Sequence, residues 1–117
     1  MSTTKIDLSF LKTIGGNDHV FIKEMLGMIL NSVPKELDNM QKHFDSGNYM
    51  LMASAAHKIK APLQMITNND MIDLIIRIET IGRKGLEVNE IPQLLNQLKL
   101  LFEMVEAEIE ITLKELV

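Results

Sequence analysis

The sequence predicts an all-α fold, namely an antiparallel up-down-up-down four-helix bundle with a short extra N-terminal helix. Leu, Ile and Met recur at three- and four-residue spacing almost from end to end of the 117 residues, which is the repeat of amphipathic helices. Aromatic residues make up only 4% of the chain and β-branched runs are short, so strands are disfavoured. Helices with one apolar stripe and short connections bury those stripes most simply as a bundle.

The first two helices are separated by a glycine pair. A short helix is expected over residues 8–14, after which Gly15-Gly16-Asn17-Asp18 supplies a stop and then a capping residue. The second helix is expected from near His19 to the turn Ser46-Gly47-Asn48. A bend or a brief break is expected at Pro34, because proline has no N–H to donate to the preceding turn. The predicted core stripe of this helix is Ile22, Leu26, Ile29, Leu30, Val33, Leu37, Met40 and Phe44.

Three more helices follow. One is expected over residues 49–66, and the next is opened by the capping residues Asn68-Asn69-Asp70 and closed by Gly85. The last is expected to be capped by Asn89, to hold Pro92 in its first turn and to reach the C-terminus. The predicted inner faces of these last two helices are Met71, Leu74, Ile75 and Ile78, and then Leu94, Leu95, Leu98, Leu101, Phe102, Val105, Ile109 and Leu113.

The composition predicts one soluble, cytoplasmic domain spanning residues 1–117. A hydrophobic content of 46% is enough for a core, and the absence of cysteine excludes disulfides, thiolate zinc sites and cysteine nucleophiles. No signal peptide and no apolar stretch of membrane-spanning length is found, so no membrane contact is expected. The net charge of -4 without a basic stripe argues against nucleic acid as a ligand.

His57 is the candidate functional residue. At about 100° per residue, it points away from the apolar stripe of the helix over residues 49–66, so it is predicted to be exposed. Lys60 lies one turn further on with Gln64 behind it, and the small side chains of Ala53 and Ala61 leave room for a partner protein. A solvated surface histidine is the alternative, but it explains neither the lysine nor the alanines. The stripe on the opposite side is Met52, Ala55, Ala56, Ile59, Leu63 and Ile66.

The sequence lacks the residue patterns that metal sites and nucleotide-binding sites require. A di-iron carboxylate bundle needs a Glu three residues before a His, and none of the three histidines has one. No HExxH sequence and no phosphate-binding glycine loop occurs.

On the helix expected between Asn68 and Gly85, the residues Ile76, Glu79 and Arg83 share an edge. Their two charged residues form either a plain surface ion pair or a group beside His57. A second apolar stripe, Phe21, Met25 and Met28, lies in the first half of the helix that begins near His19, and it is either covered by the N-terminal segment or open to a partner.

These features resemble the histidine-containing phosphotransfer (HPt) family of multistep His-Asp phosphorelays. The family pattern A-H-x-[LIM]-K-G is matched by Ala56-His57-Lys58-Ile59-Lys60, with Ala61 in the glycine position, and its Leu-Glu pair is matched by Ile78-Glu79. The stretch from Phe10 to Asp18 and the residues Phe21, Glu24-Met25-Leu26 and Pro34 also look like the opening of the family. The resemblance covers essentially the whole chain.

The resemblance implies that His57 takes a phosphoryl group from a receiver-domain aspartate and passes it to another receiver. Lys60 would offset the phosphate charge, and Glu79 would accept the Nδ1 proton of the imidazole. The expected partners are the receiver domains of a hybrid histidine kinase and of a response regulator, which bring the magnesium. The chain itself is expected to be a monomeric phosphocarrier without a cofactor and without kinase activity. The implied docking residues are Ala53, Ala61, Gln64, Ile76, Arg83 and Met25.

Three positions depart from the family pattern. Ala61 adds a methyl group where the family has glycine, and Pro62 is expected to kink the helix about one turn from His57. Thr67 stands where the family commonly has a glycine between helices. A bundle that binds receivers without carrying phosphate is therefore the alternative function.

Overall fold

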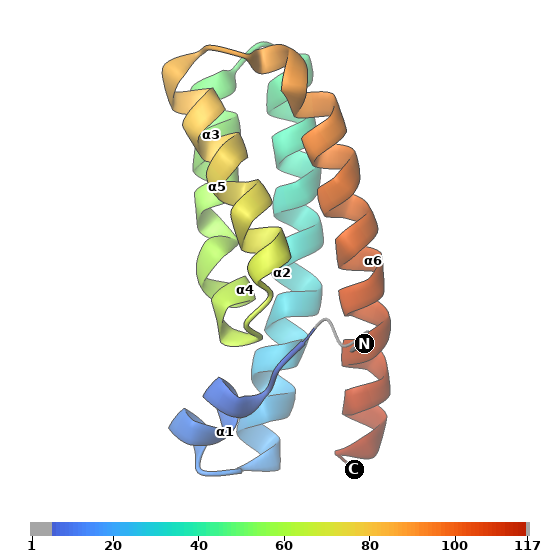
Figure 1. The fold of residues 1–117 in the computed structure, drawn as a ribbon. Coiled ribbons are helices and arrows are strands. Elements are labelled where there is room, and N and C mark those ends of the chain that lie inside the picture. The colour runs from blue at the N-terminus through green and yellow to red at the C-terminus, as the bar shows by residue number, and fades with distance from the viewer. Residues whose placement is uncertain (1–5, 117) are drawn as a thin grey trace.

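The computed structural model describes residues 6–116, and this part of the chain is helical, without strands (Figure 1). The all-α prediction is confirmed. No helix within residues 6–116 combines the length and the apolar character that crossing a membrane requires. The helices are α1 (Ser9–Gly15), α2 (His19–Asp45), α3 (Tyr49–Lys58), α4 (Lys60–Met65), α5 (Asn69–Lys84) and α6 (Ile91–Glu115), with a 3₁₀ turn, η1, over Val88–Glu90.

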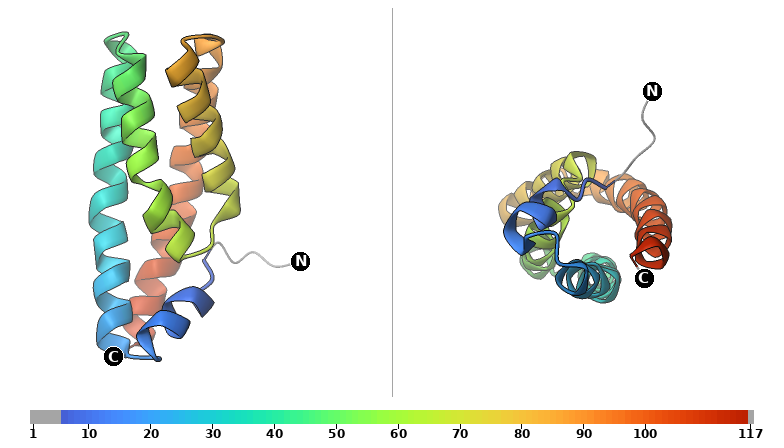
Figure 2. Two further views of the ribbon diagram at one scale, coloured as in Figure 1. Left: turned by 90° about the vertical axis from the view of Figure 1, so that its left-hand side faces the viewer. Right: turned by 90° about the horizontal axis from the view of Figure 1, so that it is seen from below.

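The long helices lie side by side along a common axis, while α1 crosses one end of α2 (Figures 1 and 2). Helix α2 contacts α3 and α6, and α5 contacts the same two helices from the other side. The space between them is filled by apolar side chains, most of which bury all or nearly all of their surface. The core includes Ile22, Leu26, Ile29, Val33, Met40, Met52, Ile59, Leu63, Ile75, Ile78, Leu98, Val105 and Ile109.

Helix α2 shows where the sequence prediction holds and where it is wrong. The carboxylate of Asp18 accepts from the Val20 amide at 2.9 Å, which is the predicted N-cap. The predicted stripe is buried apart from Leu30 and Phe44, which are half-buried. Of the bend or break expected at Pro34, the break does not occur, because buried side chains on both sides of the proline, Val33 and Leu37, belong to the core and hold one continuous helix.

A kink is expected near Pro62, and the structure has an interruption of the helix there. The single helix predicted over residues 49–66 is divided at Ile59, whose amide turns back to the carbonyl of Ala56 at 3.3 Å. Since Pro62 has no N–H, the carbonyl of Lys58 loses its usual helical partner at this point. The division falls two residues after His57, so His57 lies in the last turn of α3. The predicted inner stripe of this segment is fully or almost fully buried.

Helix α5 has both predicted ends. The side chain of Asn68 accepts from the Met71 amide at 2.9 Å, and Gly85 closes the helix in the left-handed conformation with φ +66°. The inner face differs from the prediction at Leu74, which is only half-buried. Ile81 and Gly82 are buried in addition to the predicted residues.

The start of α6 corrects the predicted cap. Asn89 lies inside the 3₁₀ turn η1, and the helix begins at Ile91 without a side-chain cap. The 3₁₀ turn closes with a bond from the Glu90 amide to the Glu87 carbonyl at 3.0 Å, and it places Asn89 one residue before the N-cap position, which Glu90 occupies. Pro92 occupies the first turn as predicted. The predicted stripe is buried except for Leu94, Leu101 and Leu113, which are half-buried.

The contact between α3 and α5 is close at Gly82. A Cβ atom at this position would lie 2.6 Å from the carbonyl oxygen of Tyr49 and 2.9 Å from the Cβ of Ala53. Only glycine therefore allows the two helices to approach at this distance. His57 and Glu79 lie about one turn further along each helix.

Gly82→Ala should destabilise the protein by about 1–3 kcal/mol, because the new methyl group meets a backbone oxygen that cannot move freely. The matched control is Gly27→Ala in α2, where a Cβ meets no atom within 4 Å. This control should gain about 0.5–1 kcal/mol from helix propensity. Urea unfolding monitored by circular dichroism measures both changes. Equal effects of the two substitutions would contradict the close contact.

Thr67→Gly should stabilise the protein by about 0.5–1 kcal/mol, since Thr67 connects α4 to α5 with φ +53°, a conformation that disfavours β-branched side chains. The control is Thr13→Gly inside α1, which should lose a few tenths of a kcal/mol. Thermal unfolding of the two variants checks the opposite signs. A loss at position 67 would show that the threonine side chain contributes more than its backbone strain costs.

Candidate functional site around His57

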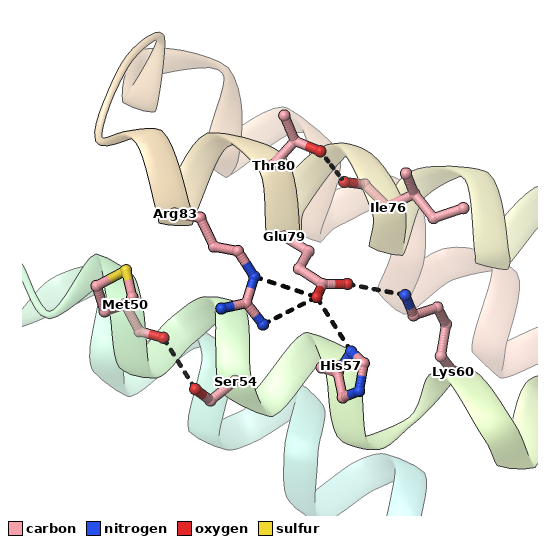
Figure 3. Close-up of polar contacts among 8 residues, drawn as sticks. All are labelled: Met50, Ser54, His57, Lys60, Ile76, Glu79, Thr80 and Arg83. Carbon is pink, nitrogen blue, oxygen red and sulfur yellow. Dashed lines mark hydrogen bonds and ion pairs between the residues drawn. The ribbon is translucent and has the colours of Figure 1, made fainter.

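His57 has the exposure that the sequence predicted. Its side chain is 60% exposed and projects from the last turn of α3 toward α5 (Figure 3). Met52, Ala55 and Ala56, which are buried, lie on the other side of the helix. The imidazole is therefore open to solvent on one side and held by the protein on the other.

The carboxylate of Glu79 is the centre of the site. Its Oε2 lies 3.0 Å from Nδ1 of His57 and accepts from the Arg83 guanidinium, with Nη2 at 3.0 Å and Nε at 3.3 Å. Its Oε1 forms an ion pair with Nζ of Lys60 at 3.0 Å. Glu79 and Arg83 come from α5, and the other two residues come from α3 and α4 (Figure 3). Both interpretations of the charged pair on α5 hold, because it is an i, i+4 ion pair and also lies beside His57.

The contact with Glu79 sets the tautomer of the histidine. An ionised carboxylate can only accept hydrogen bonds, so Nδ1 of His57 must be the donor. A neutral imidazole then carries its lone pair on Nε2. Nε2 lies on the side of the ring turned away from Glu79 (Figure 3). The site thus presents a potential nucleophile outward.

The ionised form of Glu79 is favoured in this environment. Its side chain is only 13% exposed, and this burial raises the pKa of the carboxyl group. Hydrogen bonds from Lys60, Arg83 and His57 act in the other direction and together outweigh the burial, so the pKa of Glu79 is lowered. Two permanent cations surround one carboxylate, which leaves a positive charge in excess beside the imidazole. Such a charge favours an added anion at this place.

The structure brings His57, Lys60, Glu79 and Arg83 together. The other predicted site residues differ in their exposure. Ala61, Gln64 and Ile76 are exposed. Ala53 is fully buried beside Gly82, so its side chain does not belong to the exposed surface around His57. The burial follows from the close approach of α3 and α5, which a helical wheel of one helix does not contain.

Met25 is half-buried and packs against the core. Its neighbour in the second stripe, Phe21, is also half-buried and lies against Gly15 of α1, while Met28 remains exposed. The N-terminal helix therefore covers the first part of the stripe on α2 and leaves the rest open.

Two hydroxyl residues beside the site were not predicted. Ser54 donates to the carbonyl of Met50 at 3.1 Å, and Thr80 donates to the carbonyl of Ile76 at 2.8 Å (Figure 3). The spacing of Ser54, three residues before His57, is the sequence signal that could have indicated it. Within residues 6–116, no group of three or more acidic or histidine side chains is arranged to hold a metal ion.

Comparison with known proteins adds no relative to this description. The chain matches no family model, no curated protein and no solved structure. Its function is therefore inferred from its own residues and contacts.

The Glu79 cluster should stabilise the fold only while the carboxyl group is ionised. Because the pKa of Glu79 is lowered in the folded state, the stabilisation is complete above the ordinary value of 4.5 and is lost as the pH falls through the lowered value. Wild type should thus be more stable than Glu79→Gln at pH 7, and the difference should shrink below pH 4.5. Urea unfolding of both proteins across this range measures it. A difference independent of pH would contradict the ionised cluster.

Proposed function

We propose that this chain is a histidine phosphotransfer protein in which His57 carries the phosphoryl group. The observation that carries the proposal is the exposed imidazole whose Nδ1 is bonded to Glu79 at 3.0 Å, while Lys60 is bonded to the other oxygen of the same carboxylate. This arrangement supplies a directed nucleophile and a neighbouring positive charge. These are the two properties that a transient phosphohistidine requires.

The proposed transfer begins on a receiver domain that holds an aspartyl phosphate. The lone pair on Nε2 of His57 attacks phosphorus, the bond from phosphorus to the aspartate oxygen breaks, and the free carboxylate leaves. A phosphorus–nitrogen bond replaces the phosphorus–oxygen bond. The imidazole retains its proton on Nδ1 and becomes cationic, and the carboxylate of Glu79 stabilises that charge. Attack by the aspartate of a second receiver reverses these steps and delivers the phosphoryl group onward.

The cations of the site have distinct roles in this proposal. Lys60 is mostly buried, and Glu79 holds its ammonium group close to the histidine. When phosphate arrives, Lys60 can offset its negative charge without leaving the cluster. Arg83 bonds to the same oxygen of Glu79 that accepts from His57, so it fixes the position of that oxygen.

The arrangement of helices supports the same proposal. We interpret α2, α3 with α4, α5 and α6 as an up-down-up-down four-helix bundle with α1 as the extra helix. Ala61, Gln64 and Ile76 are exposed on the elements that carry the site and would contact the receiver domains of a hybrid kinase and a response regulator. The receiver would supply magnesium and most of the catalytic groups, so the chain is a carrier and needs no cofactor of its own.

The proposal predicts labelling of one histidine. Receiver domains of candidate partners, charged with acetyl phosphate, should transfer phosphate to wild type in an acid-labile and base-stable form. His57→Gln should abolish the label, whereas His19→Gln, a change at an exposed histidine outside the cluster, should leave it unchanged. Glu79→Gln should slow transfer by about tenfold, because the imidazolium loses its charged partner.

Two outcomes would overturn the proposal. Label on the His57→Gln variant would place the phosphate elsewhere. Measurable receiver binding without any label would favour the alternative function, a bundle that binds receivers and carries no phosphate.

A further inference from the structure

A groove lies between α5 and α6, away from His57. It encloses about 630 Å³. Arg77 lines it, whereas Glu79, two residues later on α5, bonds to His57. Two residues correspond to about 200° around a helix, so the groove and the proposed phosphotransfer site lie on opposite sides of α5. The side chains that line the groove are Asp70, Asp73, Leu74, Arg77, Leu94, Gln97, Leu100, Leu101 and Met104.

The groove continues as an apolar stripe along α6. Leu100 and Met104 are 52% and 47% exposed, and Ala107 and Ile111 follow them at spacings of three and four residues. This alternation of three- and four-residue spacings is the heptad repeat through which two helices pack against each other. The opposite face of α6 is already buried in the core, so the stripe is a second apolar face on the same helix. Figure 2 shows α6 at the margin of the molecule.

The length of the stripe favours a helix over a small molecule as the occupant. From Leu94 to Ile111 the surface extends about 25 Å at the rise of an α-helix. The lower part of α6 passes beyond the first residue of α5 (Figure 1). A partner helix of four to five turns would match this length.

Both rims of the surface are acidic. Asp70 and Asp73 line the side of α5. At 100° per residue, Glu103 and Glu110 fall on the edge of the stripe opposite to Leu101, and both are exposed. None of the ion pairs formed within residues 6–116 involves these four carboxylates.

Arg77, the cation among the residues that line the groove, does not balance this charge. Arg77 is engaged by Glu87 and Glu90, with its Nη2 at 2.7 Å from Oε2 of Glu90. The pKa of Arg77 is raised by its hydrogen bonds to Glu90 and then to Glu87, which is in keeping with this engagement. Arg77 therefore leaves the negative charge of Asp70 and Asp73 unpaired.

We propose that this surface, called the α5–α6 groove below, binds an amphipathic helix of a partner protein whose apolar face is flanked by Lys or Arg. The apolar stripe of α6 would contact the apolar face of the partner helix, and the acidic rims would pair with its basic flanks. A second copy of this chain fits poorly, because it would bring Glu103 and Glu110 against the same residues. The groove goes beyond the proposed function, because a tethered partner would leave His57 free to react.

A synthetic peptide of three heptads tests the proposal on the full chain. The peptide carries Leu at heptad positions a and d and Lys at e and g, and the comparison peptide carries Glu in place of Lys. Fluorescence anisotropy should show saturable binding of the Lys peptide that weakens as sodium chloride is raised, and no binding of the Glu peptide. Binding of both peptides alike, or of neither, would overturn the proposal.

Variants locate the binding on the chain. Leu100→Gln should weaken binding of the Lys peptide by at least about fivefold, as expected for an anchor at the centre of an interface. Leu51→Gln on α3 is the matched control, because Leu51 and Leu100 are both 52% exposed, and it should have no effect. Charge reversal on both rims, Asp73→Lys with Glu103→Lys, should weaken the Lys peptide and strengthen the Glu peptide. An equal loss in the Leu51→Gln variant would overturn the site.

The oligomeric state provides the remaining test. Sedimentation equilibrium of the wild-type chain should give a monomer. A dimer that Leu100→Gln converts to monomer would show that a second copy covers the groove, and the proposal of a basic partner helix would be wrong.

Discussion

The contact between α3 and α5 at Gly82 is the constraint on which the rest of the site depends. The absence of a side chain there lets the backbone of Tyr49 and the Cβ of Ala53 approach α5 closely. One turn further along, this separation is what a histidine and a glutamate need to meet at 3.0 Å without a bridging water. A wider spacing would leave His57 as a solvated surface residue. The packing of two apolar helix faces therefore determines the chemistry of an exposed ring.

The polar cluster is stable because each member compensates another. Burial of a carboxylate is costly, but Glu79 accepts from three side chains that carry two permanent charges. In return it orients the imidazole and holds Lys60, whose flexible stem would otherwise sample many positions. The interruption at Ile59 occurs between His57 and Lys60, so the geometry that Pro62 imposes lies within the site itself. A small set of contacts thus links backbone geometry, charge and the direction of Nε2.

Helices α5 and α6 each use two faces. On α5, one side packs on α3 and supports the cluster, and the other side borders the groove. On α6, one stripe fills the core while Leu100, Met104 and Ile111 remain exposed. The two surfaces are separated by the width of a helix, so the proposed function would let one partner be retained while another reacts at His57. A carrier that serves successive partners would benefit from this separation.

The sequence by itself determined the helical class, the helix ends at Asp18, Asn68 and Gly85, and the exposure of His57, because periodicity and capping are local properties of the chain. It also indicated Glu79 as a neighbour of His57, through a resemblance in motif and spacing. The continuous path through Pro34, the burial of Ala53 and the 3₁₀ turn at Asn89 were decided by tertiary packing. Each depends on what lies across from the residue, and one-dimensional spacing does not contain that information. The α5–α6 groove was also decided by tertiary packing, since its two rims come from helices that only the fold places side by side.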